Sequence, residues 1–168
     1  MRYFLSLIIL LVVFEASCQS MIQPNTDAAS SIKSIVSETH RLISVREGHK
    51  SNLTAFKNLF LPEARFMIRN NDPAFPVESV TLDEMIELLK DDYYASYEEY
   101  GSGMVIEEYN GIAHVFESFY GKDSEGVEAR GMNSYQLVYF EDRWWISSVL
   151  WTLETEENPI PQKYLTTY

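Results

Sequence analysis

The second half of the chain is a series of long β-prone runs separated by turn signals, and this pattern constrains the fold most strongly. Aromatic and branched side chains dominate these runs, which cover residues 104–109, 112–120, 127–140 and 143–153. Asn110-Gly111 lies between the first two runs and favours a hairpin, because both residues tolerate a positive φ. The pattern predicts an antiparallel meander.

The first half of the chain carries helical patterns instead. Apolar residues at helical spacing predict an amphipathic helix over residues 28–47, and Ser51 can cap a shorter helix that Pro62 stops. Residues 64–69 predict a strand, residues 70–80 a loop, and Thr81-Leu-Asp-Glu84 matches a capping box that opens a third helix. The order predicts an α+β fold with helices packed on one face of a curved antiparallel sheet, which leaves an apolar hollow at its open end.

The N-terminus carries a pattern typical of an export signal. Arg2 precedes an apolar run from Leu5 to Phe14 that is too short to span a bilayer. We therefore expect residues 1–20 to be a signal peptide, 21–30 a flexible tether, 31–154 the folded domain and 155–168 a C-terminal tail.

Cys18 is the only cysteine of the 168 residues and lies at the end of the apolar run. Its setting, Glu15-Ala-Ser-Cys, resembles a bacterial lipoprotein signal, in which the cysteine is acylated. Glu15 stands where such signals usually carry an aliphatic residue, so cleavage by an ordinary signal peptidase near Ser17 to Ser20 is the alternative. Both predict a bacterial cell-envelope protein, either lipid-anchored or periplasmic, and a membrane contact only through an anchor at Cys18.

Charge and residue spacing exclude several classes of partner. The formal net charge is −12 and no basic stripe is present, so we expect no nucleic-acid partner. His40, His49 and His114 show no metal-ligand spacing, and we expect neither a metal nor a cofactor. The glutamates at 98, 99, 107 and 108 are interpreted as a solvated face.

Three segments carry a resemblance to a known family: Asn58 to Phe66, Gly111 to Gly121, and Arg130 to Trp151. Over roughly residues 30 to 154 the chain resembles the SnoaL-like branch of the nuclear-transport-factor-2-like superfamily. The resemblance implies a cone-shaped α+β barrel, a pocket between the sheet and the helices, and frequent dimerisation through the sheet. It implies no particular activity, because this fold hosts both enzymes and binding domains.

The faces of the last two strands depend on the loop around Glu141-Asp142-Arg143. A loop of two or four residues keeps parity and predicts one inward face and one outward face. On the inward face we expect ligand-binding residues Asn133, Tyr135, Ser148 and Leu150, with Trp144 in the core. On the outward face we expect a homodimer interface of Trp145, Val149 and Trp151. A three-residue loop would exchange the two faces.

Few side chains are candidates for catalysis or for binding a polar group of a ligand. His114 is the candidate general acid or base, against the alternative that it packs on neighbouring strands. Arg130 could bind an anionic or carbonyl group together with Asn133, against the alternative of a surface pair with Glu117 or Glu128. His40 has no Asp at helical spacing, and the expected inward strand positions carry Tyr, Asn and Ser where an isomerase of the Asp-base design would carry Asp.

Two functions follow from these observations. The favoured one is an exported domain that binds a small, largely apolar ligand, or acts as a dimeric partner module, because no catalytic dyad is identified. The alternative is a metal-independent lyase, isomerase or cyclase in which His114 moves the proton.

Overall fold

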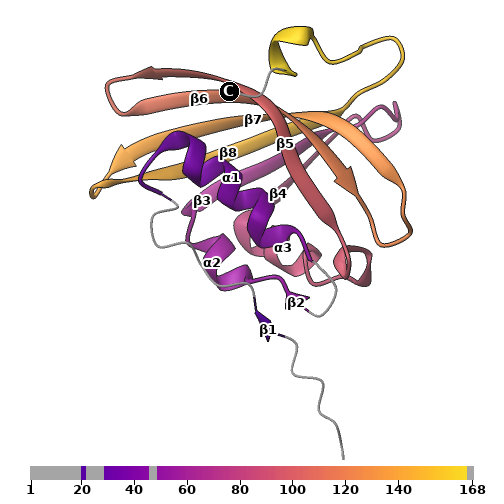
Figure 1. Ribbon diagram of the computed structural model, residues 1–168, viewed down its shortest axis with the longest axis horizontal. Coiled ribbons are helices and arrows are strands. Elements are labelled where there is room, and N and C mark those ends of the chain that lie inside the picture. Colours follow the sequence, from indigo (N-terminus) through magenta and orange to yellow (C-terminus); the bar gives the residue numbers. More distant parts are fainter. Residues whose placement is uncertain (1–19, 22–28, 46–48, 166–168) are drawn as a thin grey trace, which may run out of the picture.

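The computed structural model describes residues 20–21, 29–45 and 49–165. One curved sheet wraps around the helices, which lie on its concave side (Figure 1). Residues 1–19 of the predicted signal peptide, which include Cys18, and residues 22–28 of the predicted tether lie outside the described residues. The predicted α+β class, a cone-like curved sheet packed on helices, is confirmed.

The main sheet has six strands in the order β4-β3-β8-β7-β6-β5. Its strands are β3 (Phe60–Arg69), β4 (Val77–Thr81), β5 (Glu98–Tyr109), β6 (Ile112–Lys122), β7 (Glu128–Phe140) and β8 (Arg143–Leu153). Only the β3–β8 pair is parallel within this sheet. A separate two-stranded pair joins β1 (Ser20–Met21) to β2 (His49–Lys50).

Three short helices fill the concave side of the sheet: α1 (Ile32–Ile43), α2 (Leu53–Lys57) and α3 (Leu82–Leu88). Two 3₁₀ turns follow, η1 (Asp92–Tyr94) and η2 (Gln162–Tyr164). Helix α1 is shorter than predicted because the Ser31 hydroxyl accepts a hydrogen bond from the Ser34 amide and so fixes its start. Ile35 and Leu42 on its inner face are fully buried, and each stabilises the fold by about 1.5–3 kcal/mol.

Both predicted hairpins form. Asn110 and Gly111 have φ values of 47° and 80°, as their turn requires. Glu141 and Asp142 also have positive φ and make a two-residue turn, so that Tyr139 faces Trp144 across the β7–β8 ladder. The capping box at the start of α3 is confirmed.

A β-bulge in β8 reverses the faces beyond the turn. Leu137 pairs with Ile146, whereas Gln136 pairs with Ser148, which leaves Ser147 as an extra residue. An extra residue turns every later side chain to the opposite face of a strand. The predicted faces are therefore correct near the turn and wrong from Ser148 onward.

Other expectations also differ from the structure: Asn52 caps α2 in place of Ser51, and Pro62 lies within β3 instead of ending that helix. Residues 77–80, predicted as the end of a loop, belong to edge strand β4, which is exposed over most of its length and so lacks the alternation that marks a strand. Strand β5 begins at Glu98, well before the predicted start at Met104, and it carries a bulge between Gly101 and Gly103.

The C-terminal segment packs against the convex face of the sheet as far as residue 165. The Ser118 hydroxyl donates a 2.5 Å hydrogen bond to the Tyr164 carbonyl. The rings of Phe116 and Tyr164 lie 5.7 Å apart. In Figure 1 this segment is the yellow chain beyond β8. It covers part of a face that would otherwise expose more apolar surface.

Candidate functional site

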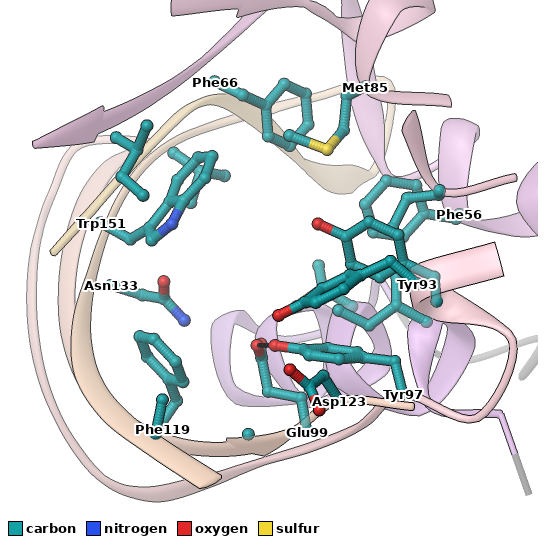
Figure 2. A pocket seen from close by; sticks show the side chains of 18 of the residues that line it. Phe56, Phe66, Met85, Tyr93, Tyr97, Glu99, Phe119, Asp123, Asn133 and Trp151 are labelled. Atoms are coloured by element: carbon teal, nitrogen blue, oxygen red, sulfur yellow. Dashed lines mark hydrogen bonds between the residues drawn. The ribbon is translucent and has the colours of Figure 1, made fainter. Parts of the chain in front are cut away.

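A cavity of about 290 Å³ lies between the concave face of the sheet and the helices (Figure 2). Most of its wall is apolar or aromatic. The aromatic residues of the wall are Phe56, Phe60, Phe66, Tyr93, Tyr94, Tyr97, Phe119, Tyr135 and Trp151. Such a wall favours a ligand with an apolar body.

The polar groups of the cavity are few and convergent. Figure 2 shows the side chains of Tyr93, Tyr97 and Asn133 directed toward the open space, with Glu99 and Asp123 beside the tyrosines. Phe66 and Met85 lie at the top of the view, away from Glu99 and Asp123 at the bottom, and Trp151 lies at the left above Asn133. The cavity therefore has an apolar end and an end rich in carboxylate and hydroxyl groups.

A buried ion cluster forms the floor beneath the polar end. His40 Nδ1 lies 2.7 Å from Glu99 Oε1, and His40 Nε2 lies 2.6 Å from Glu117 Oε2. The side chains of His40 and Glu117 are 5% and 1% exposed, and Glu99 is 12% exposed and reaches the cavity. The Tyr97 hydroxyl donates a hydrogen bond to the second oxygen of Glu99. We call His40, Glu99 and Glu117 the ion triad.

The ion triad holds His40 in its charged form. Burial alone would lower the pKa of His40, but hydrogen bonds and charge from Glu117 and Glu99 outweigh it and raise the pKa to about 10. Both ring nitrogens then donate protons, one to each carboxylate. At neutral pH the cluster carries one positive and two negative charges.

A glycine makes room for the ion triad. A Cβ atom on Gly101 would overlap the Glu117 carboxylate, because strand β5 passes directly beside it at the bulge. Gly101 on β5 and Glu117 on β6 both face the side of the sheet on which His40 lies. The bulge and the glycine thus belong to the geometry that lets a carboxylate reach the buried imidazole.

Tyr135 links the ion triad to Asn133 and to helix α1. Its hydroxyl lies 3.4 Å from Thr39 Oγ1 and accepts a 3.3 Å hydrogen bond from the Asn133 amide. Burial, assisted by the charges of Glu117 and Glu99, raises the pKa of Tyr135 well above its usual range. The hydroxyl therefore stays protonated and remains a donor at neutral pH.

Asp123 supplies the second carboxylate of the cavity. Its Oδ1 accepts hydrogen bonds of 2.9 Å and 2.8 Å from the backbone amides of Glu125 and Val127. It is 9% exposed. Burial and the nearby Asp123 carboxylate raise the pKa of Tyr93, whose hydroxyl is hydrogen-bonded to it. The loop after β6 thus fixes a carboxylate at the edge of the polar end.

The predicted ligand residues of the last two strands lie on two different faces of the sheet. Asn133 and Tyr135 are buried on the cavity wall. Ser148 and Leu150 were expected on the same face, and this is wrong. The bulge at Ser147 turns them to the convex face, where Leu150 is 40% exposed.

The same bulge corrects the predicted dimer face. Val149 is buried in the core and Trp151 lies on the cavity wall, so neither belongs to the convex face. Trp145 precedes the bulge and does lie on the convex face, where its ring stacks on Phe140 at 5.4 Å and beneath the Arg143 guanidinium at 4.0 Å.

His114 and Arg130 lie away from the cavity. His114 Nε2 is 3.0 Å from the Ser134 hydroxyl, and its ring packs edge-on against Phe116 on the convex face. His114 occupies an outward position of β6, so the structure shows the alternative in which it packs on neighbouring residues, and it does not show the candidate acid or base of a ligand in the hollow. Arg130 is 45% exposed and pairs with Glu154 at 3.4 Å, so the expected surface pair forms with a partner other than Glu117 or Glu128. It is not among the described residues that line the cavity.

Sequence reasoning missed the ion triad. His40 was compared only with acidic residues on its own helix, whereas Glu99 and Glu117 come from strands 59 and 77 residues away. Glu99 was placed in a solvated face, but only its neighbours in that group are exposed. One signal was present: Glu117 occupies an inward position of β6 between Val115 and Phe119, where an apolar residue is normal.

Within residues 20–21, 29–45 and 49–165, no group of three or more His, Cys, Asp or Glu side chains is arranged to hold a metal ion. No helix in this part of the chain has the length and apolar character needed to cross a membrane.

The raised pKa of His40 predicts a pH-dependent stability. The folded chain holds the His40 proton more tightly than the unfolded chain, whose pKa is near 6.5, so this contribution is complete below about pH 6.5. It declines by about 1.4 kcal/mol per pH unit as the pH rises from there toward 10. Urea unfolding at pH 7, 8 and 9 measures the slope.

The variants His40→Asn and His114→Asn separate this effect from general titration. His40→Asn should be less stable by about 3–5 kcal/mol, because the buried carboxylates lose their common donor, and its stability should be flat over this range. His114→Asn should keep the slope of the natural chain. An equal slope in His40→Asn would contradict the charged ion triad.

Comparison with known proteins bears on the fold. No family model matches the chain, and no curated protein sequence matches it. Solved structures do match. A nuclear-transport-factor-2-like protein of unknown function from Pseudomonas aeruginosa aligns with a TM-score of 0.60 and 12% identity, covering 73% of this chain and 98% of that one.

Two further structures agree. A protein with a cystatin-like fold from Nostoc punctiforme has a TM-score of 0.57 and 8% identity, with coverage of 74% and 90%. A provisionally named scytalone dehydratase from Novosphingobium aromaticivorans has a TM-score of 0.56 and 11% identity, with coverage of 74% and 82%. At these identities the likeness concerns the fold alone, which is the nuclear-transport-factor-2-like, or cystatin-like, cone.

Proposed function

We propose that this chain is a binding protein of the SnoaL-like type that holds a small, largely apolar molecule in the cavity between sheet and helices. The observation that carries the proposal is the cavity itself: about 290 Å³ of space with an aromatic wall and a small set of convergent polar groups. Pockets of this composition bury an apolar body and orient it through a few polar contacts.

The enzymatic alternative loses its acid or base. His114 lies on the convex face with Ser134 and Phe116, so it cannot reach a molecule held in the cavity. In the ion triad, both oxygens of Glu99 are already engaged by His40 and Tyr97. These contacts favour a carboxylate that stays fixed over one that exchanges protons with a ligand.

Ligand binding predicts a thermal shift that depends on the cavity. We expect 3-phenylpropan-1-ol at ten times its Kd to raise the Tm by about 3–5 °C, since it binds only the folded chain. Ala129→Phe should abolish the shift because Ala129 lies on the cavity wall. Leu150→Ala, on the convex face, should keep it. A shift that survives Ala129→Phe would place binding elsewhere.

We also propose that the convex face pairs two copies of the chain. Ile112, Phe116 and Leu150 are 61%, 37% and 40% exposed on this face, beside Trp145. Exposed apolar side chains gathered on one sheet face usually mark an interface.

Light scattering coupled to size-exclusion chromatography tests the pairing. Leu150→Lys should convert a dimer to a monomer, because it places a charge in the apolar contact. Leu88→Lys changes a leucine on helix α3 that is 48% exposed and should leave the dimer intact. A natural chain that elutes as a monomer at high concentration would contradict the interface.

The remaining proposal concerns export. The signal-like N-terminus supports a cell-envelope location, with Cys18 as the acylated first residue of the mature chain. Intact-mass spectrometry of the membrane fraction should show a chain starting at Cys18 and carrying acyl groups. The Cys18→Ala variant should lose that mass. An unmodified chain that starts near Ser20 would support ordinary cleavage instead.

A further inference from the structure

The charged side chains described in the cavity wall are all acidic. The described residues that line it include two carboxylates, Glu99 and Asp123, and no lysine, arginine or histidine. A ligand that enters the polar end therefore meets acidic groups without a basic group to balance them. This excess of acidic groups indicates which charge the head group of the ligand carries. The apolar wall alone does not indicate it.

The ion triad leaves an excess of negative charge. One imidazolium at His40 is shared between two carboxylates, so the cluster keeps one net negative charge. Among the residues that the structure describes, Asp123 forms no ion pair, and its partners are backbone amides and the Tyr93 hydroxyl. Burial strengthens the field of both carboxylates, since less water screens them.

Aromatic faces surround the same end. The rings of Tyr93, Tyr94 and Tyr97 form a chain of edge contacts, with centroids 5.0 Å and 5.2 Å apart. Phe119 and Trp151 stand across the open space from them (Figure 2). The face of an aromatic ring carries partial negative charge and attracts a cation that approaches it.

From these observations we infer that the ligand is an organic cation, a primary amine or quaternary ammonium carried on an apolar body, with its charged nitrogen near Asp123 and Glu99. The inference rests on the proposed binding function and gives the cavity a ligand class. The cavity has about twice the volume of an apolar cavity of roughly 150 Å³ that holds benzene, which suits an amine of roughly ten non-hydrogen atoms.

The two other head-group chemistries fit less well. A carboxylate or phosphate ligand would bring a third negative charge into a space that offers no basic side chain among its described lining residues. A neutral alcohol can bond to Asn133 or Tyr97 but gains nothing from the excess charge. The net charge of −12 also raises the local concentration of cations over anions near the protein.

Three ligands with one common body test the inference: 3-phenylpropylammonium, 3-phenylpropan-1-ol and 3-phenylpropanoate. Isothermal titration of the full mature chain at pH 7 measures each Kd. We expect the ammonium to bind about tenfold more tightly than the alcohol, and the carboxylate to bind more weakly than both. The preference for the ammonium over the alcohol should fall as salt is raised.

The variant Asp123→Asn locates the charged contact. It keeps an oxygen that can accept the loop amides, so the fold should persist, and an unchanged Tm within about 2 °C checks this. The ammonium should lose about tenfold in affinity and the alcohol should be unaffected. Glu107→Gln removes one charge from an exposed position of β5 and should change neither Kd.

The outcomes separate this inference from the function on which it rests. If alcohol and ammonium bind equally, or the carboxylate binds best, the cation inference is overturned while the apolar binding function stands. If none of the three ligands binds, both are overturned. If the ammonium is preferred but Asp123→Asn leaves the preference intact, the assigned contact is wrong and the ammonium is held elsewhere.

Discussion

The architecture of the site depends on one buried contact, the imidazolium of His40 held between Glu99 and Glu117. It joins helix α1 to strands β5 and β6 at the floor of the cavity. Removing charged groups from water costs several kcal/mol per ion, and the cost is offset only when each charge is paired at close range. The distances of 2.7 Å and 2.6 Å meet that requirement.

This contact also decides what the cavity presents to a ligand. Glu99 is fixed by His40 on one oxygen and by Tyr97 on the other, so its carboxylate faces the open space without freedom to turn away. Glu117 is hidden behind it and adds charge without adding a contact. The polar end is thus preorganised and acidic, whereas the rest of the wall, built from Phe66 and its neighbours, is suited to an apolar body.

Local signals predicted much of the fold. The Asn110-Gly111 turn, the capping box at Thr81 and the last strand follow from short-range chemistry, and each is present. The bulge at Ser147 has no such signal, because one extra serine in a β-prone run leaves composition and length unchanged. This bulge alone places Leu150 on the convex face and Trp151 on the concave face, which is the reverse of the prediction.

The site was harder to predict than the fold for a related reason. Asn133 and Tyr135 were placed correctly because side chains alternate without interruption along β7, whereas the extra residue lies in β8. The pairing of His40 with Glu117 joins residues 77 apart and depends on the curvature of the sheet. Helical spacing around His40 shows no acidic partner. An acidic residue at an inward strand position was the one available sign that a buried partner existed.

The charge state of His40 is the central claim, and nitrogen NMR of its side chain measures it directly. The account predicts that both ring nitrogens of His40 carry protons at pH 8, where a histidine with the usual pKa near 6.5 is neutral. A spectrum in which His40 shows one protonated and one unprotonated nitrogen at that pH would contradict the ion triad, and with it the charge balance assigned to the cavity.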